Sequence, residues 1–212
     1  MIYTTLSTKH WLTLAMLILA IIIASIQPLE LESYLLHQVG TVFMLIILFI
    51  CQKKIGLSYP TFLLYIVFLL VHVSAAHYLY SYVPYNDWIK TVFHFDLNQA
   101  MGWQRNMYDR FVHLGYGILL YPFFYRLFQV TLPSLNPKAL FLITIQFIMA
   151  SSLFYEWIEW WLAIGLSPEQ AENYNGQQGD VWDAHKDMFL ATVGAMMTGF
   201  ILYWQATRPN SR

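Results

Sequence analysis

Residues 179–188 read GDVWDAHKDM, and a long apolar run from Met188 to Thr207 follows directly. This run is long enough to cross the hydrocarbon core of a membrane, which takes about 20 mostly apolar residues. Three aspartates stand in the decapeptide before it. Carboxylates at a membrane boundary are costly to desolvate unless they meet water, a cationic partner or a metal ion. The stretch therefore predicts a transmembrane helix that begins in an acidic site.

The rest of the chain repeats this pattern of apolar runs. Of its 212 residues, 58% are hydrophobic and only 11% are charged, whereas soluble domains carry about 25% charged residues. The predicted spans lie at approximately residues 10–28, 34–52, 60–80, 110–130, 139–161 and 187–206. We therefore expect an all-α, polytopic transmembrane helical bundle of about six spans, with residues 1–212 as a single integral membrane domain. The first run lacks a small-residue cleavage site, which favours a retained span over a signal peptide.

Lysines and arginines predict the orientation, because they gather in cytoplasmic loops. They mark one set of span ends: Lys9, Lys53, Lys54, Arg126, Lys138, Arg208 and Arg212. The opposite loops are acidic or mixed. Six spans with both the N and the C terminus in the cytoplasm satisfy this distribution. The loop over residues 82–108 holds Lys90 and Arg105 on the other side, and we expect part of it to lie along the membrane interface.

Charge and cysteine content exclude several classes of protein. The net charge of −1 leaves no basic footprint, so we expect membrane lipids, and no nucleic acid, as partners. The single cysteine, Cys51, forms no intrachain disulfide and is expected to be a small packing residue. The sequence also lacks a Walker motif, a GxSxG elbow, an HExxH pair and the histidine boxes of membrane desaturases.

Asp109 and His113 stand four residues apart at the start of the fourth span. This spacing puts both side chains on one helical face, where they can ligate one ion. The alternative is structural. Asp109 would then be an N-cap or a first-turn acid favoured by the helix dipole, and His113 would hydrogen-bond to a neighbour.

Glu156 and Glu159 share a face late in the fifth span, among Trp157, Trp160 and Trp161. The tryptophans are typical of a membrane interface. Two acids at the C-terminal end of a helix oppose its dipole, so they favour a nearby cation. The alternative is an acidic rim in contact with water.

The three aspartates of the opening stretch divide into two kinds. Asp180 is a candidate N-cap of the last span, with Asp183 near the third helical position. Asp183 and Asp187 share a face and repel each other unless a positive group lies between them. They are therefore the stronger candidates for chemistry, whereas His72 and His77 on the third span are expected to be packing histidines. Small residues recur every four positions on the last span and predict close helix packing: Ala191, Ala195 and Gly199.

The predicted topology brings the polar ends of the third to sixth spans to the outer side of the membrane. Acids and a histidine projecting from several helices of a bundle are typical of a metal site. The predicted ligands to a divalent metal ion are Asp109, His113, Glu156, Glu159, Asp180, Asp183 and Asp187. Glu159, Asp183 and Asp187 are also candidate catalytic acid–base groups. Oxygen-rich ligands suit Mg²⁺, Mn²⁺ or Ca²⁺, and a histidine among them also allows Zn²⁺ or Fe²⁺.

Four motifs carry a resemblance to a known family. They are HYxYxxVP (residues 77–84), YDRxxH (108–113), YExxEW (155–160) and QGDxWDxxxDM (178–188). From about His72 to Gly199 the chain resembles the bacterial YjdF-like inner-membrane proteins of unassigned function. The resemblance implies a multi-pass protein of the bacterial inner (cytoplasmic) membrane and implies no activity. A looser similarity, to VanZ-like membrane proteins, rests on an acid–histidine helix start and an aspartate-rich last span.

Three functions compete for this sequence. The first is a membrane-embedded, metal-dependent enzyme that acts on a lipid or lipid-linked substrate at the outer side. The second is a cation- or proton-coupled transporter that uses the same acids. The third is a non-catalytic membrane factor in which the polar cluster only holds helices together. The metal hypothesis requires carboxyl oxygens from the fourth, fifth and sixth spans within about 5 Å of a common point, because bonds to hard cations are about 2.0–2.6 Å long.

Overall fold

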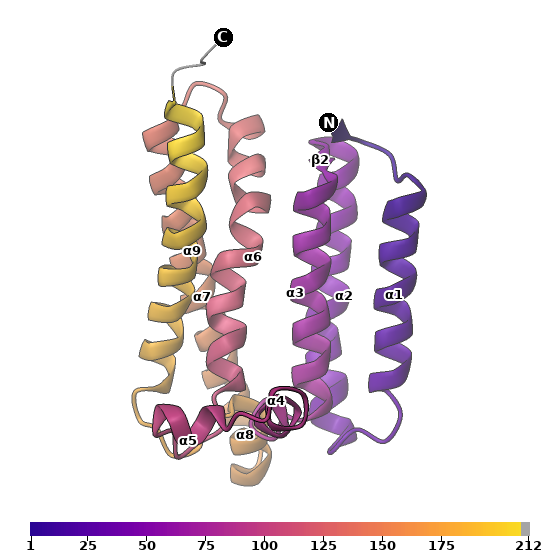
Figure 1. Cartoon of the computed structure of the whole chain (residues 1–212), viewed down its shortest axis with the longest axis vertical. Coiled ribbons are helices and arrows are strands. Elements are labelled where there is room, and N and C mark those ends of the chain that lie inside the picture. The colour runs from indigo at the N-terminus through magenta and orange to yellow at the C-terminus, as the bar shows by residue number, and fades with distance from the viewer. Residues whose placement is uncertain (209–212) are drawn as a thin grey trace.

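The computed structural model describes residues 1–208, apart from the side chains of Glu169 and Asn173, so the predicted cytoplasmic charge at Arg212 lies outside the described residues. Six long helices run side by side along one axis (Figure 1). They are α1 (Thr8–Ala24), α2 (Leu31–Lys54), α3 (Tyr59–His77), α6 (Tyr108–Thr131), α7 (Pro137–Gly165) and α9 (Asp183–Thr207). Three short helices gather at one end: α4 (Tyr85–Phe93), α5 (Leu97–Met101) and α8 (Pro168–Asn175).

A long helix occupies each of the six predicted runs, and the chain is a helical membrane protein. Among the described residues, four helices are long and apolar enough to cross a membrane: α2, α3, α7 and α9. Helix α1 is apolar but has 17 residues. Helix α6 has 24 residues and carries Asp109, Arg110 and His113 in its first two turns.

The helix ends follow from local sequence, with two corrections to the predicted boundaries. Asn136 caps α7, because its side chain accepts the Ala139 N–H at 2.9 Å. The prediction that the acids of α7 stand at its C terminus is wrong, because the helix continues to Gly165. The prediction that Asp180 is the N-cap of α9 is also wrong: the cap position is Trp182. Asp180 instead accepts the Trp182 N–H at 3.1 Å and shapes the turn before the helix.

Helices α6 and α9 approach each other closely where glycines face one another. A Cβ added to Gly117 would lie 2.0 Å from the Ala191 carbonyl oxygen, and one added to Gly194 would lie 2.3 Å from the Leu114 carbonyl oxygen. Ala191 and Ala195 are fully buried. The predicted close packing of small residues on the last span is therefore confirmed. This contact fixes α9 against α6 and so positions the polar residues at the start of both helices.

At the end of the molecule opposite α4, α5 and α8, hydrogen bonds to backbone groups hold neighbouring segments together. Strand β1 (Ile2–Tyr3) pairs antiparallel with β2 (Leu57–Ser58). Arg126 of α6 donates from its guanidinium to the carbonyls of Ile55 and Gly56, both at 3.1 Å. It therefore satisfies orphan acceptors after α2. Cys51 packs against the apolar core, as predicted.

Candidate metal centre

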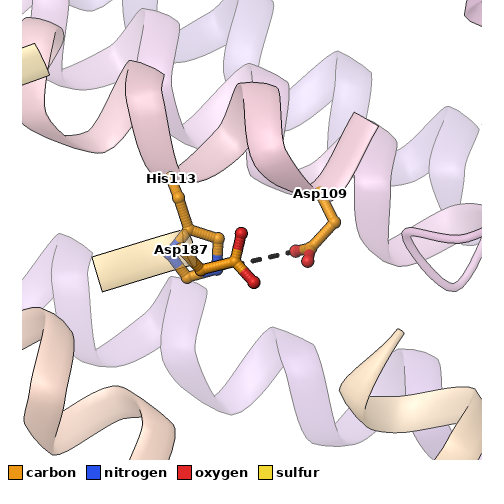
Figure 2. A group of neighbouring side chains, drawn as sticks. All are labelled: Asp109, His113 and Asp187. Carbon is orange, nitrogen blue, oxygen red and sulfur yellow. Dashed lines mark ion pairs between the residues drawn. The ribbon is translucent and has the colours of Figure 1, made fainter. Parts of the chain in front are cut away.

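Asp109, His113 and Asp187 meet at the end of the bundle where the short helices lie. Asp109 and His113 project from successive turns of α6, and Asp187 faces them from α9 (Figure 2). One ligand atom from each of the three residues lies within 4.8 Å of the others, and all three side chains are buried. His113 Nε2 is 3.6 Å from Asp109 Oδ1. The expectation was that carboxyl oxygens from the fourth, fifth and sixth spans come within about 5 Å of a common point. The group joins carboxylates of the fourth span (α6) and the sixth span (α9), and it includes no carboxylate of the fifth span (α7).

Two carboxylate oxygens around this group have no hydrogen-bond partner among the described residues. Asp187 Oδ1 is one of them; its nearest cation is Arg110 Nε at 3.7 Å, and the residue is only 2% exposed. Glu156 Oε1 of α7 is the other, 4.0 Å from His113 Nδ1 on a residue that is 8% exposed. A buried carboxylate oxygen without a donor is costly, and a bound cation removes that cost.

Glu159 lies one turn beyond Glu156 on α7 and shares its helical face. Its side chain is half-buried, and it is not part of the group of three. Trp157, Trp160 and Trp161 on the same turns are exposed. Exposed tryptophans are typical of the headgroup level of a membrane. The acids of α7 therefore lie on the same turns as an exposed group of tryptophans of this kind.

Asp180 and Asp183 lie instead against basic side chains. Arg110 Nη2 is 2.7 Å from both Asp180 Oδ2 and Asp183 Oδ1, and Arg105 Nη1 is 2.6 Å from Asp183 Oδ1. Lys186 Nζ lies 2.6 Å from Asp180 Oδ2. The hydrogen bonds from Lys186 and Arg110 hold the pKa of Asp180, in the turn before α9, well below its ordinary value. Four of the seven predicted ligands therefore lie around one point: Asp109, His113, Glu156 and Asp187. Asp180 and Asp183 are paired with basic side chains, and Glu159 adjoins Glu156 without joining either group.

Sequence reasoning assigned no role to Arg105 and Arg110. One signal for Arg110 was available, because a cation in the first turn of a helix opposes the dipole and needs an acidic partner. Arg105 offers no comparable signal, since it stands in an irregular loop and its partner Asp183 lies 78 positions further along the chain. The arginines orient the loop before α9 and leave Asp187, one turn deeper, to face α6.

A second polar cluster, which the sequence alone did not predict, joins α2 to α3. His37 of α2 stacks on Tyr80 and Tyr174, with ring centroids 4.9 and 4.4 Å apart, and its Nδ1 donates to the Ser33 carbonyl at 2.7 Å. His72 donates to the His37 carbonyl at 3.2 Å and accepts from the Tyr80 hydroxyl. The prediction that His72 is a satisfied packing histidine is confirmed.

Comparison with known proteins agrees with the motifs. Residues 9–208 match a family model described as "Predicted membrane protein (DUF2238)". The inner membrane protein YjdF of Escherichia coli strain K12 is 29% identical over 146 residues, which cover 69% of this chain and 64% of that protein. No solved structure matches the chain. The resemblance to YjdF-like inner-membrane proteins is therefore confirmed. The chain is a multi-helix protein of the inner membrane that belongs to the DUF2238 family of predicted membrane proteins.

Proposed function

We propose that Asp109, His113 and Asp187 bind one divalent metal ion, with Glu156 as a further ligand from α7. The observation that carries this proposal is the convergence of three buried ligand atoms within 4.8 Å, next to two carboxylate oxygens without a donor. A set of carboxylates with one imidazole suits Mn²⁺, Zn²⁺ or Fe²⁺. Asp180 and Asp183 have cationic partners of their own, so we assign them to positioning the start of α9.

The proposed activity is that of a metal-dependent enzyme acting on a lipid or lipid-linked substrate. A divalent ion in this position would activate water or bind a phosphate group of the substrate. Glu159 is the candidate acid–base group, because it adjoins Glu156 and is not held by arginine in the described structure. The neighbouring exposed tryptophans support a substrate whose reacting group lies at headgroup depth.

Transport is less well supported, because the polar residues of the candidate site gather at one end of the bundle. Along the middle of α6, α7 and α9 the buried core of the described residues consists of Tyr121, Ile148, Ala191 and Ala195, and its buried polar side chains are the hydroxyl-bearing Thr144 and Ser152 rather than acids or bases. A cation pathway needs polar groups at membrane depth from one side to the other. The confinement of the candidate site to one end favours chemistry at a membrane surface.

Lipid conversion tests the proposed activity. Purified protein in vesicles of total bacterial lipid extract should convert a lipid component when Mn²⁺ or Zn²⁺ is added. The conversion should stop when EDTA is added. Asp187→Asn should be inactive, whereas Asp87→Asn, at an exposed acid of α4, should keep full activity. Mass spectrometry of the extracted lipids measures both. The absence of any metal-dependent change in the wild type would overturn the enzymatic proposal and favour a non-catalytic membrane factor.

We further propose that six helices span the membrane and that both termini are cytoplasmic. The N terminus and the C-terminal end of α9 lie at the same end of the bundle in Figure 1, together with the lysines and arginines that predict the cytoplasmic side. On a Cys51→Ala background, a membrane-impermeant maleimide should label Asp87→Cys in intact cells. It should label Lys54→Cys only after the inner membrane is permeabilised. Both positions are exposed, so reversed labelling would show the opposite orientation.

A further inference from the structure

Helix α4 (Tyr85–Phe93) is short and divides cleanly into two faces. At 100° per residue, its apolar side chains fall on one continuous arc: Trp88, Val92, Tyr85, Ile89 and Phe93. The opposite arc is polar: Asn86, Asp87, Lys90 and Thr91. Such a division in a helix too short to span a bilayer is typical of helices that lie in the plane of the membrane interface.

Hydrogen bonds at the start of the helix fix its orientation. The buried Tyr85 donates its hydroxyl to Asn98 Oδ1 at 2.6 Å and accepts the Met107 N–H at 3.1 Å. Asn86 donates to Asp96 Oδ1 at 3.1 Å and accepts the Asn98 N–H at 3.1 Å. These bonds tie α4 to α5 and to the start of α6, so the helix cannot rotate to bury its remaining apolar side chains.

Three side chains of the apolar arc are consequently exposed. Val92 is 67%, Phe93 72% and Trp88 45% exposed. The Trp88 ring packs edge-on against Tyr78, which follows directly after α3, with centroids 6.1 Å apart. In Figure 1, helix α4 is seen nearly end-on, at the lower end of the bundle where α3 ends and α6 begins. The exposed apolar side chains of α4 therefore lie beside the end of α3, one of the helices long and apolar enough to cross a membrane.

We infer that α4 is an interfacial helix whose exposed apolar side chains Val92 and Phe93 insert into the lipid leaflet on the side of the candidate metal centre. Lipid is the occupant that fits, because the Trp88 side of the apolar arc packs against the end of the apolar helix α3, while the exposed Asp87 and Lys90 on the opposite arc remain in water. The helix would anchor the loop that carries Arg105 at headgroup depth. This inference does not depend on metal binding or on catalysis.

Site-directed spin labelling tests the inference. On the Cys51→Ala background, single cysteines at Val92, Phe93, Asp87 and Thr91 are labelled and reconstituted in phosphatidylethanolamine–phosphatidylglycerol vesicles. Labels at 92 and 93 should collide more with oxygen than with a water-soluble nickel chelate, and labels at 87 and 91 should show the reverse. All four side chains are exposed, so the variants should fold, and size-exclusion profiles check this. High nickel accessibility at all four positions would overturn the inference, and so would protection of positions 92 and 93 from both reagents.

Discussion

Gly117→Ala should prevent stable folding or strongly lower the melting temperature. The added methyl group would lie 2.0 Å from the Ala191 carbonyl oxygen and 2.5 Å from the Ala195 amide nitrogen. Both atoms belong to the backbone of α9, so relief requires the two helices to separate. Overpacking usually costs about 1–3 kcal/mol, and occasionally more. A fluorescent fusion followed through size-exclusion chromatography and heating measures the loss.

Gly115→Ala is the matched control, two residues away on the same helix. Its methyl group would meet only Leu119 Cδ1, at 3.8 Å, which is ordinary van der Waals contact. Alanine in place of glycine inside a helix is more favourable by about 0.5–1 kcal/mol. We therefore expect this variant to be as stable as the wild type, or more so. Equal melting temperatures for Gly117→Ala and the wild type would contradict the close contact between α6 and α9.

Arg110→Gln should destabilise the protein far more than Lys186→Gln. Both cations contact Asp180 Oδ2, at 2.7 and 2.6 Å, but the Arg110 side chain is 10% exposed and that of Lys186 47% exposed. Removing one partner of a buried ion pair costs about 3–5 kcal/mol. We expect the lower end of this range, because Arg105 continues to pair with Asp183. An exposed pair contributes little.

Denaturant unfolding in mild detergent compares the two variants. A clear loss of unfolding free energy for Arg110→Gln, with almost no change for Lys186→Gln, supports the assignment of Asp180 and Asp183 to positioning α9. Equal stability of both variants would mean that Arg110 is not needed to neutralise the acids of this turn. They would then be available as metal ligands, as the sequence alone predicted.

The long helices could be predicted from sequence, because long apolar runs are typical of membrane-spanning helices. The pairing of Asp109 with His113 could also be predicted, since helical spacing places them on one face. The sequence could not predict which of the aspartates in residues 179–188 face Asp109 and His113. That choice depends on Arg110, whose partner Asp183 lies 73 positions away, and on a helix that begins at Asp183. Spacing within α9 does not contain this information.

The tight crossing of α6 and α9 illustrates the same limit. Small residues on the last span predicted a close contact, but their partner did not follow from the pattern. Gly117 is one of two glycines only two residues apart on α6, and only this one faces α9. The role of His37 was missed for a similar reason: a lone histidine in an apolar run carries no sign of the tyrosines that stack on it from other segments.

Metal content tests the central claim most directly. Protein purified without chelator, desalted and measured by inductively coupled plasma mass spectrometry should carry roughly one divalent ion per chain. Asp187→Asn should lose most of it while remaining monodisperse, and Asp87→Asn should retain it. Wild-type protein without metal that also fails to take up added Mn²⁺ or Zn²⁺ would contradict the account. Equal metal content in Asp187→Asn and the wild type would contradict it as well.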